Sequence, residues 1–129
     1  MVEVVRVLEL FSGVGGMHRA ADIAASALTN TTMTVVGAVD INTVSNEIYK
    51  HNHPTTNHMQ KNITGMTVSQ VMKLSPDLVL MSPPCQPHTR QGKQLDTKAS
   101  WKQRGIIFKG IILRFPGLTR ILEVLLCIT

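Results

Sequence analysis

The chain has 129 residues, about one small domain, with 13 lysines and arginines against 8 aspartates and glutamates. Its apolar fraction of 43% is typical of a globular protein and argues against a disordered one, and no apolar run reaches the roughly 20 residues of a membrane span. Two cysteines outside any Cys-x-x-Cys pattern argue against a secreted disulfide scaffold, and with no signal-peptide pattern at the start they predict a cytoplasmic or nuclear location.

The first fifty residues alternate between strand and helix patterns. Short apolar runs rich in β-branched residues are typical of strands buried on both faces, and apolar residues at helical spacing mark one face of a helix. The predicted elements are a strand over residues 4–10, a glycine-rich turn over residues 12–16, a helix over residues 17–28, a strand over residues 34–39 that ends at Asp40, and a helix capped by Asn42 or Thr43 that runs to about residue 50.

The next segment is less regular. We expect residues 51–66 to be irregular apart from a short strand near Ile63. Residues 67–70 have the form of a capping box, so a helix should begin there and end at residues 75–76, before a short apolar strand over residues 77–81. Alternating strands and helices predict an α/β fold with a parallel sheet covered on both faces, whose ligands bind at the carboxyl ends of the strands.

The last third of the chain is basic. Residues 1–89 hold five lysines and arginines against six acidic residues, whereas residues 90–129 hold eight against two. This excess fits a polyanionic partner such as nucleic acid, and it fits a solvated basic tail equally well. The pattern predicts a polar loop over residues 86–104, a strand over residues 106–115 and a helix over residues 118–128.

Three unusual features follow predicted strand ends. A glycine-rich turn over residues 12–16 lets backbone N–H groups approach a ligand closely. Asp40 can accept hydrogen bonds from a ribose, or it can serve as a carboxylate at a helix N-terminus. Two prolines in residues 83–85 fix the backbone that presents Cys85, a candidate nucleophile whose thiolate Arg90 and Lys93 would stabilise.

Three segments resemble motifs of the cytosine-5 methyltransferases, in the same order and spacing. They are Val7-Leu8-Glu9-Leu10-Phe11-Ser12-Gly13-Val14-Gly15-Gly16-Met17, then Asp40-Ile41-Asn42 with Asn46-Glu47-Ile48-Tyr49, and Pro83-Pro84-Cys85-Gln86-Pro87. Their wording is most similar to the branch that looks like a DNA methyltransferase but modifies tRNA. The resemblance covers about residues 4–98 and implies a Rossmann-like, S-adenosylmethionine-dependent fold, of which this chain holds the N-terminal part of the parallel sheet.

The resemblance also implies roles for individual residues. Those implied to bind S-adenosylmethionine are Phe11, Ser12, Gly13, Gly15, Gly16, Asp40, Ile41, Asn62, Ile63 and Pro84. Within this set Phe11 and Ile41 would contact the adenine and Asp40 the ribose, although Asn62 stands where the family often has an aspartate. Cys85 would attack carbon 6 of a cytosine that has left its stack, so that carbon 5 accepts the methyl group. Arg90 and Lys93 would contact the nucleic acid.

Residues 99–129 match the family poorly. The family's Glu-Asn-Val motif, its Arg-x-Arg motif and its target-recognition region are absent, and His88 replaces a usual phenylalanine. We therefore divide the chain into residues 1–98, the N-terminal part of a methyltransferase domain, and a divergent tail over residues 99–129, and we expect weak cofactor binding with little turnover. The alternatives are a fragment of a DNA cytosine-5 methyltransferase and a non-catalytic remnant that binds cofactor or RNA. The oligomeric state stays open.

Three histidines cluster in the sequence at positions 51, 53 and 58. They lack cysteine or carboxylate partners at ligand spacing, so a surface turn is a better interpretation than a zinc site. We accordingly predict no metal site.

Overall fold

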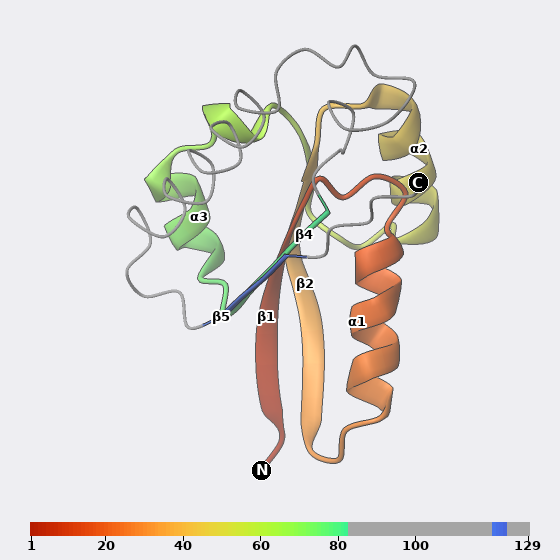
Figure 1. Ribbon diagram of the computed structural model, residues 1–129, viewed down its shortest axis with the longest axis vertical. Coiled ribbons are helices and arrows are strands. Elements are labelled where there is room, and N and C mark those ends of the chain that lie inside the picture. Colours follow the sequence, from red (N-terminus) through yellow and green to blue (C-terminus); the bar gives the residue numbers. More distant parts are fainter. Residues whose placement is uncertain (83–119, 124–129) are drawn as a thin grey trace.

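The structure is a computed structural model that describes residues 1–82 and the backbone of residues 120–123. Within this part, five parallel strands form one sheet in the order β3-β2-β1-β4-β5 (Figure 1). The strands are β1 (Glu3–Leu10), β2 (Thr31–Asp40), β3 (His58–Gln60), β4 (Leu78–Met81) and β5 (Arg120–Glu123). The helices are α1 (Gly16–Ser26), α2 (Thr43–Asn52), the single 3-10 turn η1 (Ile63–Gly65) and α3 (Val68–Leu74). The expected α/β class with a parallel sheet is confirmed.

The order of the strands locates the place where a ligand would bind. Along the chain the sheet grows from β1 to β2 and β3 on one side, and then resumes at β4 on the other side of β1. In open parallel sheets of this kind, ligands occupy the crevice outside the carboxyl ends of the strands, where the order reverses. Here that position lies beyond the ends of β1 and β4, which pair in register up to Leu10 and Met81.

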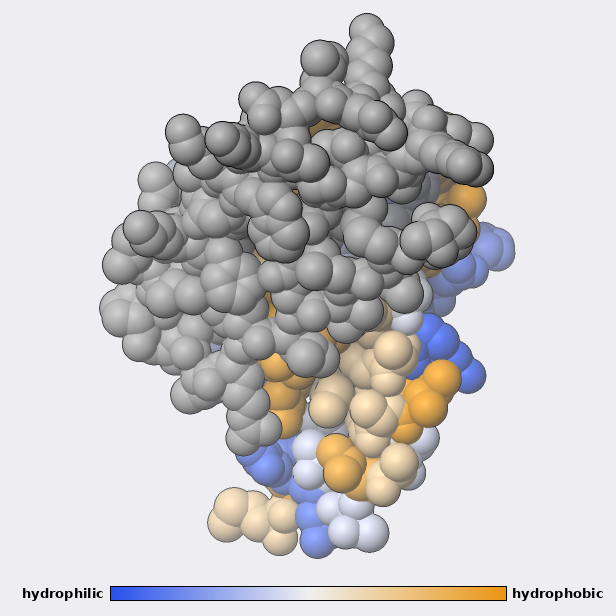
Figure 2. Space-filling view, in the orientation of Figure 1, coloured by the Kyte–Doolittle hydropathy of each residue, from blue (hydrophilic) through white to orange (hydrophobic). Residues whose placement is uncertain are grey.

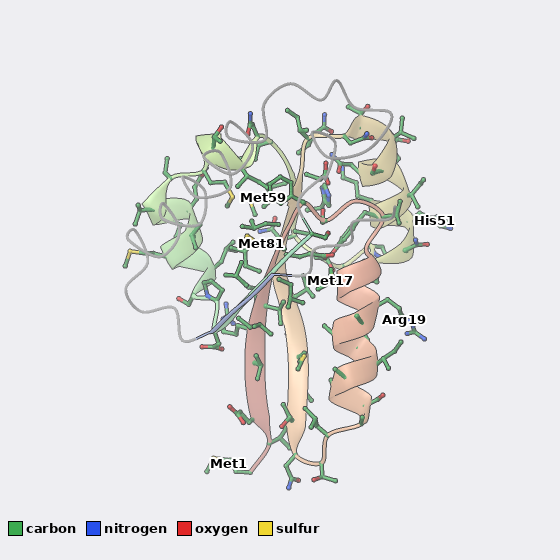
Figure 3. The ribbon with its side chains drawn as sticks, viewed as in Figure 1. Met1, Met17, Arg19, His51, Met59 and Met81 are labelled. Carbon is green, nitrogen blue, oxygen red and sulfur yellow. The ribbon has the colours of Figure 1, made fainter. Side chains whose placement is uncertain are left out.

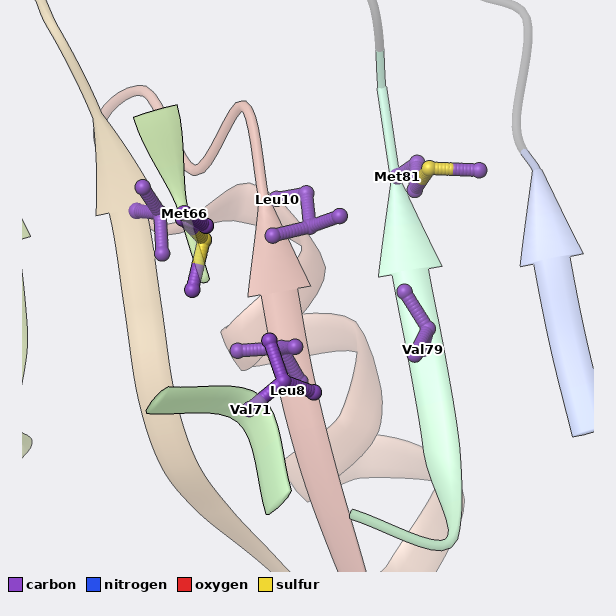
Figure 4. Packing of buried hydrophobic residues seen from close by; sticks show 7 residues of the cluster. Leu8, Leu10, Met66, Val71, Val79 and Met81 are labelled. Atoms are coloured by element: carbon purple, nitrogen blue, oxygen red, sulfur yellow. The ribbon is translucent and has the colours of Figure 1, made fainter. Parts of the chain in front are cut away.

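Helices cover both faces of the sheet, with α1 and α2 on one side and α3 on the other (Figure 1). Each face buries its own apolar cluster, because successive strand residues point to opposite faces. The cluster under α3 consists of Leu8, Leu10, Val39, Met66, Val71, Val79 and Met81 (Figure 4). The cluster on the α1 side consists of Val5, Val7, Ala21, Val35 and Leu80. The two clusters hold β1 rigidly in the centre of the sheet, so the turn that follows it starts from a fixed point.

The helix ends follow the sequence signals closely. Asn42 caps α2 by accepting a hydrogen bond from the Ser45 N–H, at 3.0 Å. Thr67 and Gln70 form the predicted capping box of α3. That helix ends at its C-cap Ser75, which has a left-handed conformation (φ 43°) and is followed by a proline. The predicted end of the helix at residues 75–76 is confirmed.

Two predictions of secondary structure are wrong. The strand in the irregular segment is β3, which ends three residues before Ile63, and Ile63 begins η1 instead. The helix predicted over residues 118–128 is wrong at residues 120–123, which form β5 and pair in parallel with β4. A short apolar run fits the repeat of a helix and the repeat of a strand equally well. The strand is favoured here because it pairs with the backbone N–H and C=O groups that the edge of β4 would otherwise leave unpaired. The loop predicted over residues 86–104 and the strand over 106–115 lie outside the described residues.

The end of the molecule opposite the glycine-rich turn exposes several large apolar side chains, which are Met1, Val2, Val4, Ile23 and Leu28. Figure 2 shows apolar and polar side chains interspersed there, around the start of β1 and the end of α1. Among the described residues, no helix combines the length and apolar character needed to cross a bilayer.

Candidate functional site

The turn after β1 is built on unusual backbone conformations. Phe11, Gly13 and Gly15 all have positive φ angles, of 55°, 51° and 97° respectively. A left-handed conformation is inexpensive for glycine and strained for other residues, which explains the glycines and marks Phe11 as strained. Gly15 is the N-cap of α1 and provides no side-chain cap. The turn therefore places the N-terminus of α1 at the carboxyl edge of the sheet.

Asp40, at the end of β2, joins this turn to the start of α2. Its Oδ2 accepts a hydrogen bond from the Gly13 N–H at 2.8 Å, and its Oδ1 accepts one from the Asn42 N–H at 2.8 Å. Asn46, which is buried, donates from Nδ2 to the Asp40 carbonyl at 3.2 Å. The carboxylate thus orders backbone at a helix start, and each of its oxygens keeps a second lone pair for a further donor.

Four strand ends meet at this edge. Beyond β4, the Ser82 hydroxyl donates to the Phe11 carbonyl at 3.2 Å. Beyond β3, the Lys61 N–H donates to the Asp40 carbonyl at 3.2 Å, which brings Asn62 to the same edge. The expected convergence of the glycine-rich turn and Asp40 is confirmed. Pro84, Cys85, Arg90 and Lys93 lie outside the described residues.

The other predicted cofactor residues differ in how available they are. A Cβ added at Gly13 or Gly16 would meet nothing within 4 Å, so open space lies beside both glycines. Ser12 is buried, with its hydroxyl 3.5 Å from Nε2 of His58. Ile41 is 64% exposed and free to cover a flat ligand.

Three of the residues predicted to bind the cofactor already contact other parts of the protein. Phe11 and Ile63 both pack against the apolar cluster under α3, which leaves only part of each side chain for an adenine. The side-chain oxygen of Asn62 accepts hydrogen bonds from the N–H and hydroxyl of Thr64, at 3.1 and 2.9 Å. A nucleoside at this edge therefore fits the residues present best at Gly13, Gly16, Asp40 and Ile41.

Sequence reasoning missed a buried polar network beside the turn. Glu9 of β1 is fully buried, and its Oε2 accepts a hydrogen bond from the Tyr49 hydroxyl of α2 at 2.9 Å. The same hydroxyl lies 2.8 Å from Nδ1 of His18, in the first turn of α1. Burial raises the pKa of Glu9 from 4.5 to about 7, against the opposing influence of Tyr49 and of the nearby N–H groups of His18 and Met17. The network ties β1, α1 and α2 together directly below the glycine-rich turn.

The three histidines of residues 51–58 do not form one cluster. His51 is exposed and points away from the sheet (Figure 3). His53 stacks on His18, with ring centroids 3.7 Å apart, whereas His58 lies beside Tyr49 at 4.9 Å. The predicted surface turn is therefore wrong for all three: His51 lies on the exposed side of α2, the half-buried His53 is the C-cap of that helix, and the half-buried His58 begins β3.

Within the described part of the chain, three buried polar atoms have no hydrogen-bond partner: Oε1 of Glu9, Oδ1 of Asn46 and Nδ1 of His58. Such atoms are costly unless a ligand or water satisfies them. Of the three residues, Asn46 bonds to the Asp40 carbonyl, which brings it to the carboxyl edge of the sheet.

Comparison with known proteins places the chain in context. The family model of C-5 cytosine-specific DNA methylases matches residues 5–112. The chain is 52% identical over 95 residues to the tRNA (cytosine(38)-C(5))-methyltransferase of Homo sapiens, and these residues are 74% of this chain and 23% of that protein. It is 38% identical over 95 residues to a DNA (cytosine-5)-methyltransferase of Dictyostelium discoideum, covering 74% of this chain and 24% of the relative.

Among solved structures, the crystal structure of S. pombe Dnmt2 methyltransferase superposes with a TM-score of 0.65 at 34% identity, over 94% of this chain and 34% of that one. This likeness supports a Rossmann-like sheet. The chain spans about a quarter of the length of the curated relatives it matches.

Proposed function

Since the chain belongs to the family of C-5 cytosine-specific DNA methylases, we propose that it provides the S-adenosylmethionine site and the nucleophile of a tRNA cytosine-5 methyltransferase. One observation carries the proposal. The Gly13 N–H and the Asp40 carboxylate meet at 2.8 Å on the carboxyl edge of the sheet, beside open space at Gly13 and Gly16. An adenosyl ligand needs this combination of a carboxylate for the ribose and backbone free of side chains.

Each part of the edge would contact a different part of the cofactor. Asp40 would accept hydrogen bonds from the ribose hydroxyls, using the carboxylate lone pairs that the N–H groups of Gly13 and Asn42 leave free. Ile41, which is exposed, would cover one face of the adenine, and Gly16 would leave room for the amino-acid end. When bound, S-adenosylmethionine supplies an electrophilic methyl group.

The chemical step would belong to Cys85. Its thiolate would add to carbon 6 of the cytosine, carbon 5 would take the methyl group, and loss of the carbon-5 proton would expel the thiolate again. Ser82, three residues earlier, supports this role because its hydroxyl donates to the Phe11 carbonyl at the start of the glycine-rich turn. The target base must leave its stack to reach such a site.

The names of the relatives favour tRNA as the substrate. Relatives from mammals, an insect and fission yeast are named tRNA (cytosine(38)-C(5))-methyltransferases, at 44–52% identity. The name of the Dictyostelium relative keeps DNA as the second candidate, at 38% identity. The basic residues after position 89, Arg90 and Lys93 among them, suit either polyanion. A cytoplasmic or nuclear location remains part of the proposal.

Calorimetric titration of S-adenosylmethionine into the 129-residue chain tests the cofactor site. We expect saturable binding to one site, with the affinity reduced about tenfold or more in Asp40→Asn, because one hydrogen bond to a charged acceptor contributes about 1.5–3 kcal/mol. Glu47→Gln removes the same charge from an exposed position of α2 and should bind like the wild type. Circular dichroism of each variant separates loss of the site from loss of the fold. Absence of binding by a folded wild-type chain would contradict the proposal.

A further inference from the structure

Two histidines and an aspartate meet on the outer side of the buried network, where α1 passes the end of α2. We propose that His18, Asp22 and His53 bind one divalent transition-metal ion of the Zn²⁺ type. One ligand atom from each residue lies within 4.8 Å of the others. His18 and Asp22 are one helical turn apart on α1, and His53 is the C-cap residue of α2. The set is distinct from the histidines of positions 51 and 58, which lie elsewhere.

The hydrogen bonds around His18 leave its outer nitrogen ready to bind a cation. The Tyr49 hydroxyl donates to Oε2 of Glu9 at 2.9 Å, which leaves its oxygen available to accept a hydrogen bond from Nδ1 of His18, 2.8 Å away. This arrangement suits the tautomer of His18 that carries its hydrogen on Nδ1 and a lone pair on Nε2. In that tautomer Nε2 of His18 and Oδ1 of Asp22, which lie 3.9 Å apart, are both acceptors that a metal ion can bridge.

The surroundings of His18 are those of a metal ligand. Metal-binding histidines almost always donate their other ring N–H to a carboxylate or another acceptor, which fixes the ring and strengthens the ligand. Here Tyr49 and the buried Glu9 form that outer shell. Two imidazole nitrogens with one carboxylate oxygen suit Zn²⁺, and a water molecule would fill the fourth position.

Closure of the site requires only side-chain movement. Tetrahedral Zn²⁺ with ligands at about 2.0 Å holds its donor atoms about 3.3 Å apart, so the present cluster must contract. Asp22 can move because its side chain is 42% exposed. His53 lies at a helix end, and its ring, which is nearly parallel to that of His18, must tilt for both lone pairs to converge.

The site would connect to the glycine-rich turn. Nε2 of His53 lies 2.8 Å from the position of a Cβ built on Gly15, so the ring occupies the room that this glycine leaves. A metal ion that fixes His53 would therefore also fix the turn that begins α1.

Titration of the metal-free 129-residue chain with Co²⁺ and then Zn²⁺ tests this inference. We expect one saturable site with the visible absorption of four-coordinate Co²⁺, without the near-ultraviolet band of a thiolate ligand, and displacement by Zn²⁺. Asp22→Asn and His53→Ala should each weaken binding at least tenfold. Tyr49→Phe should weaken it about 10–100-fold, because it removes the outer-shell acceptor.

Matched controls keep the result specific. His51→Ala removes an exposed histidine of α2 that points away from the sheet (Figure 3), and Glu47→Gln removes an exposed carboxylate; both variants should bind the metal ion as the wild type does. Circular dichroism verifies that each variant is folded, and Asp22→Asn, with its exposed side chain, should not disturb folding. Absence of saturable binding, a thiolate band, or unchanged affinity in folded Asp22→Asn would each overturn the proposal, and a proton would then be the cation between His18 and Asp22.

Discussion

The N–H of Gly13 donates a hydrogen bond to Oδ2 of Asp40 at 2.8 Å, across the ends of two neighbouring strands. This contact explains why an aspartate and a left-handed glycine, 27 residues apart, occur at these positions. The glycine can adopt φ 51° without strain, and the conformation directs its N–H at the carboxylate. The pair therefore fixes the shape of the edge where the proposed cofactor binds.

Gly16→Ala should abolish cofactor binding and leave the fold intact. Gly16 is the first residue of α1, and a Cβ there meets no protein atom within 4 Å, so alanine should raise the free energy of unfolding by as much as about 1 kcal/mol. The added methyl group would occupy the space proposed for the amino-acid end of S-adenosylmethionine. Calorimetric titration measures the expected loss of cofactor affinity, and chemical denaturation measures the expected gain in the free energy of unfolding.

Ser69→Ala is the control for that variant. Ser69 is exposed in the first turn of α3, away from the proposed site, and should change neither affinity nor fold. Unchanged cofactor affinity in Gly16→Ala would show that the ligand does not approach this glycine.

Glu9 should make stability depend on pH. Its pKa is raised on folding from 4.5 to about 7, so the native state holds a proton that the unfolded chain has lost in this range. The resulting stability is fully present below pH 4.5 and is lost as pH rises through 7, by on the order of 3 kcal/mol. Glu9→Gln keeps an acceptor for Tyr49 and should remove this dependence. The groups that face Glu9 are Tyr49, His18 and Asp40.

Chemical denaturation of the wild type and of Glu9→Gln between about pH 4.5 and 8, with a chelator present, measures the free energy of unfolding at each pH. The contribution of Glu9 is the difference between the two pH profiles. Parallel pH profiles of wild type and Glu9→Gln would mean that Glu9 is not protonated in the native state.

The two cysteines should behave differently toward RNA. A cytosine that carries fluorine at carbon 5 has no proton to lose there, so the adduct with the nucleophile persists once methylation has occurred. With 5-fluorocytosine tRNA and S-adenosylmethionine, we expect a denaturation-resistant adduct that Cys85→Ser abolishes and Cys127→Ser retains. Denaturing electrophoresis measures the adduct, and the same experiment with 5-fluorocytosine DNA distinguishes the two candidate substrates. An adduct that survives Cys85→Ser would contradict the proposed role of this thiol.

Thr67→Ala should lower the free energy of unfolding by about 1 kcal/mol. The Thr67 hydroxyl accepts from the Gln70 N–H at 3.2 Å, and this N-cap bond is lost in alanine. Thr55→Ala, at an exposed position between α2 and β3, is the control and should have little effect. Equal stability of the two variants would mean that the capping box does not stabilise α3.

Local signals made much of the fold predictable. The strand around Val7 and the helix capped by Asn42 follow from residues that are neighbours in sequence, and so does the capping box at Thr67. Asp40 was predictable as a site residue because it ends a strand, and the carboxyl ends of parallel strands meet at the edge of the sheet where ligands bind. β3 was misplaced because three residues give too short a pattern, and Ile63 nearby is more apolar than His58 or Gln60.

The polar network was not predictable, because its partners are far apart in sequence. Tyr49 lies 40 residues after Glu9, and only the position of α2 beside the end of β1 brings them together. One signal was present: Glu9 is an acidic residue in a strand whose neighbours are apolar, and a buried charge requires a partner. The position of His53 over Gly15 likewise depends on how the end of α2 meets the start of α1.

Backbone amide shifts recorded by NMR during titration with S-adenosylhomocysteine, the demethylated cofactor, test the central claim most directly. The account predicts saturable shifts at the carboxyl edge, at Gly13, Gly16 and Ile41, and none at Glu3 or Thr31 at the opposite ends of β1 and β2. Shifts confined to the opposite ends of the strands, or none in a folded chain, would contradict it.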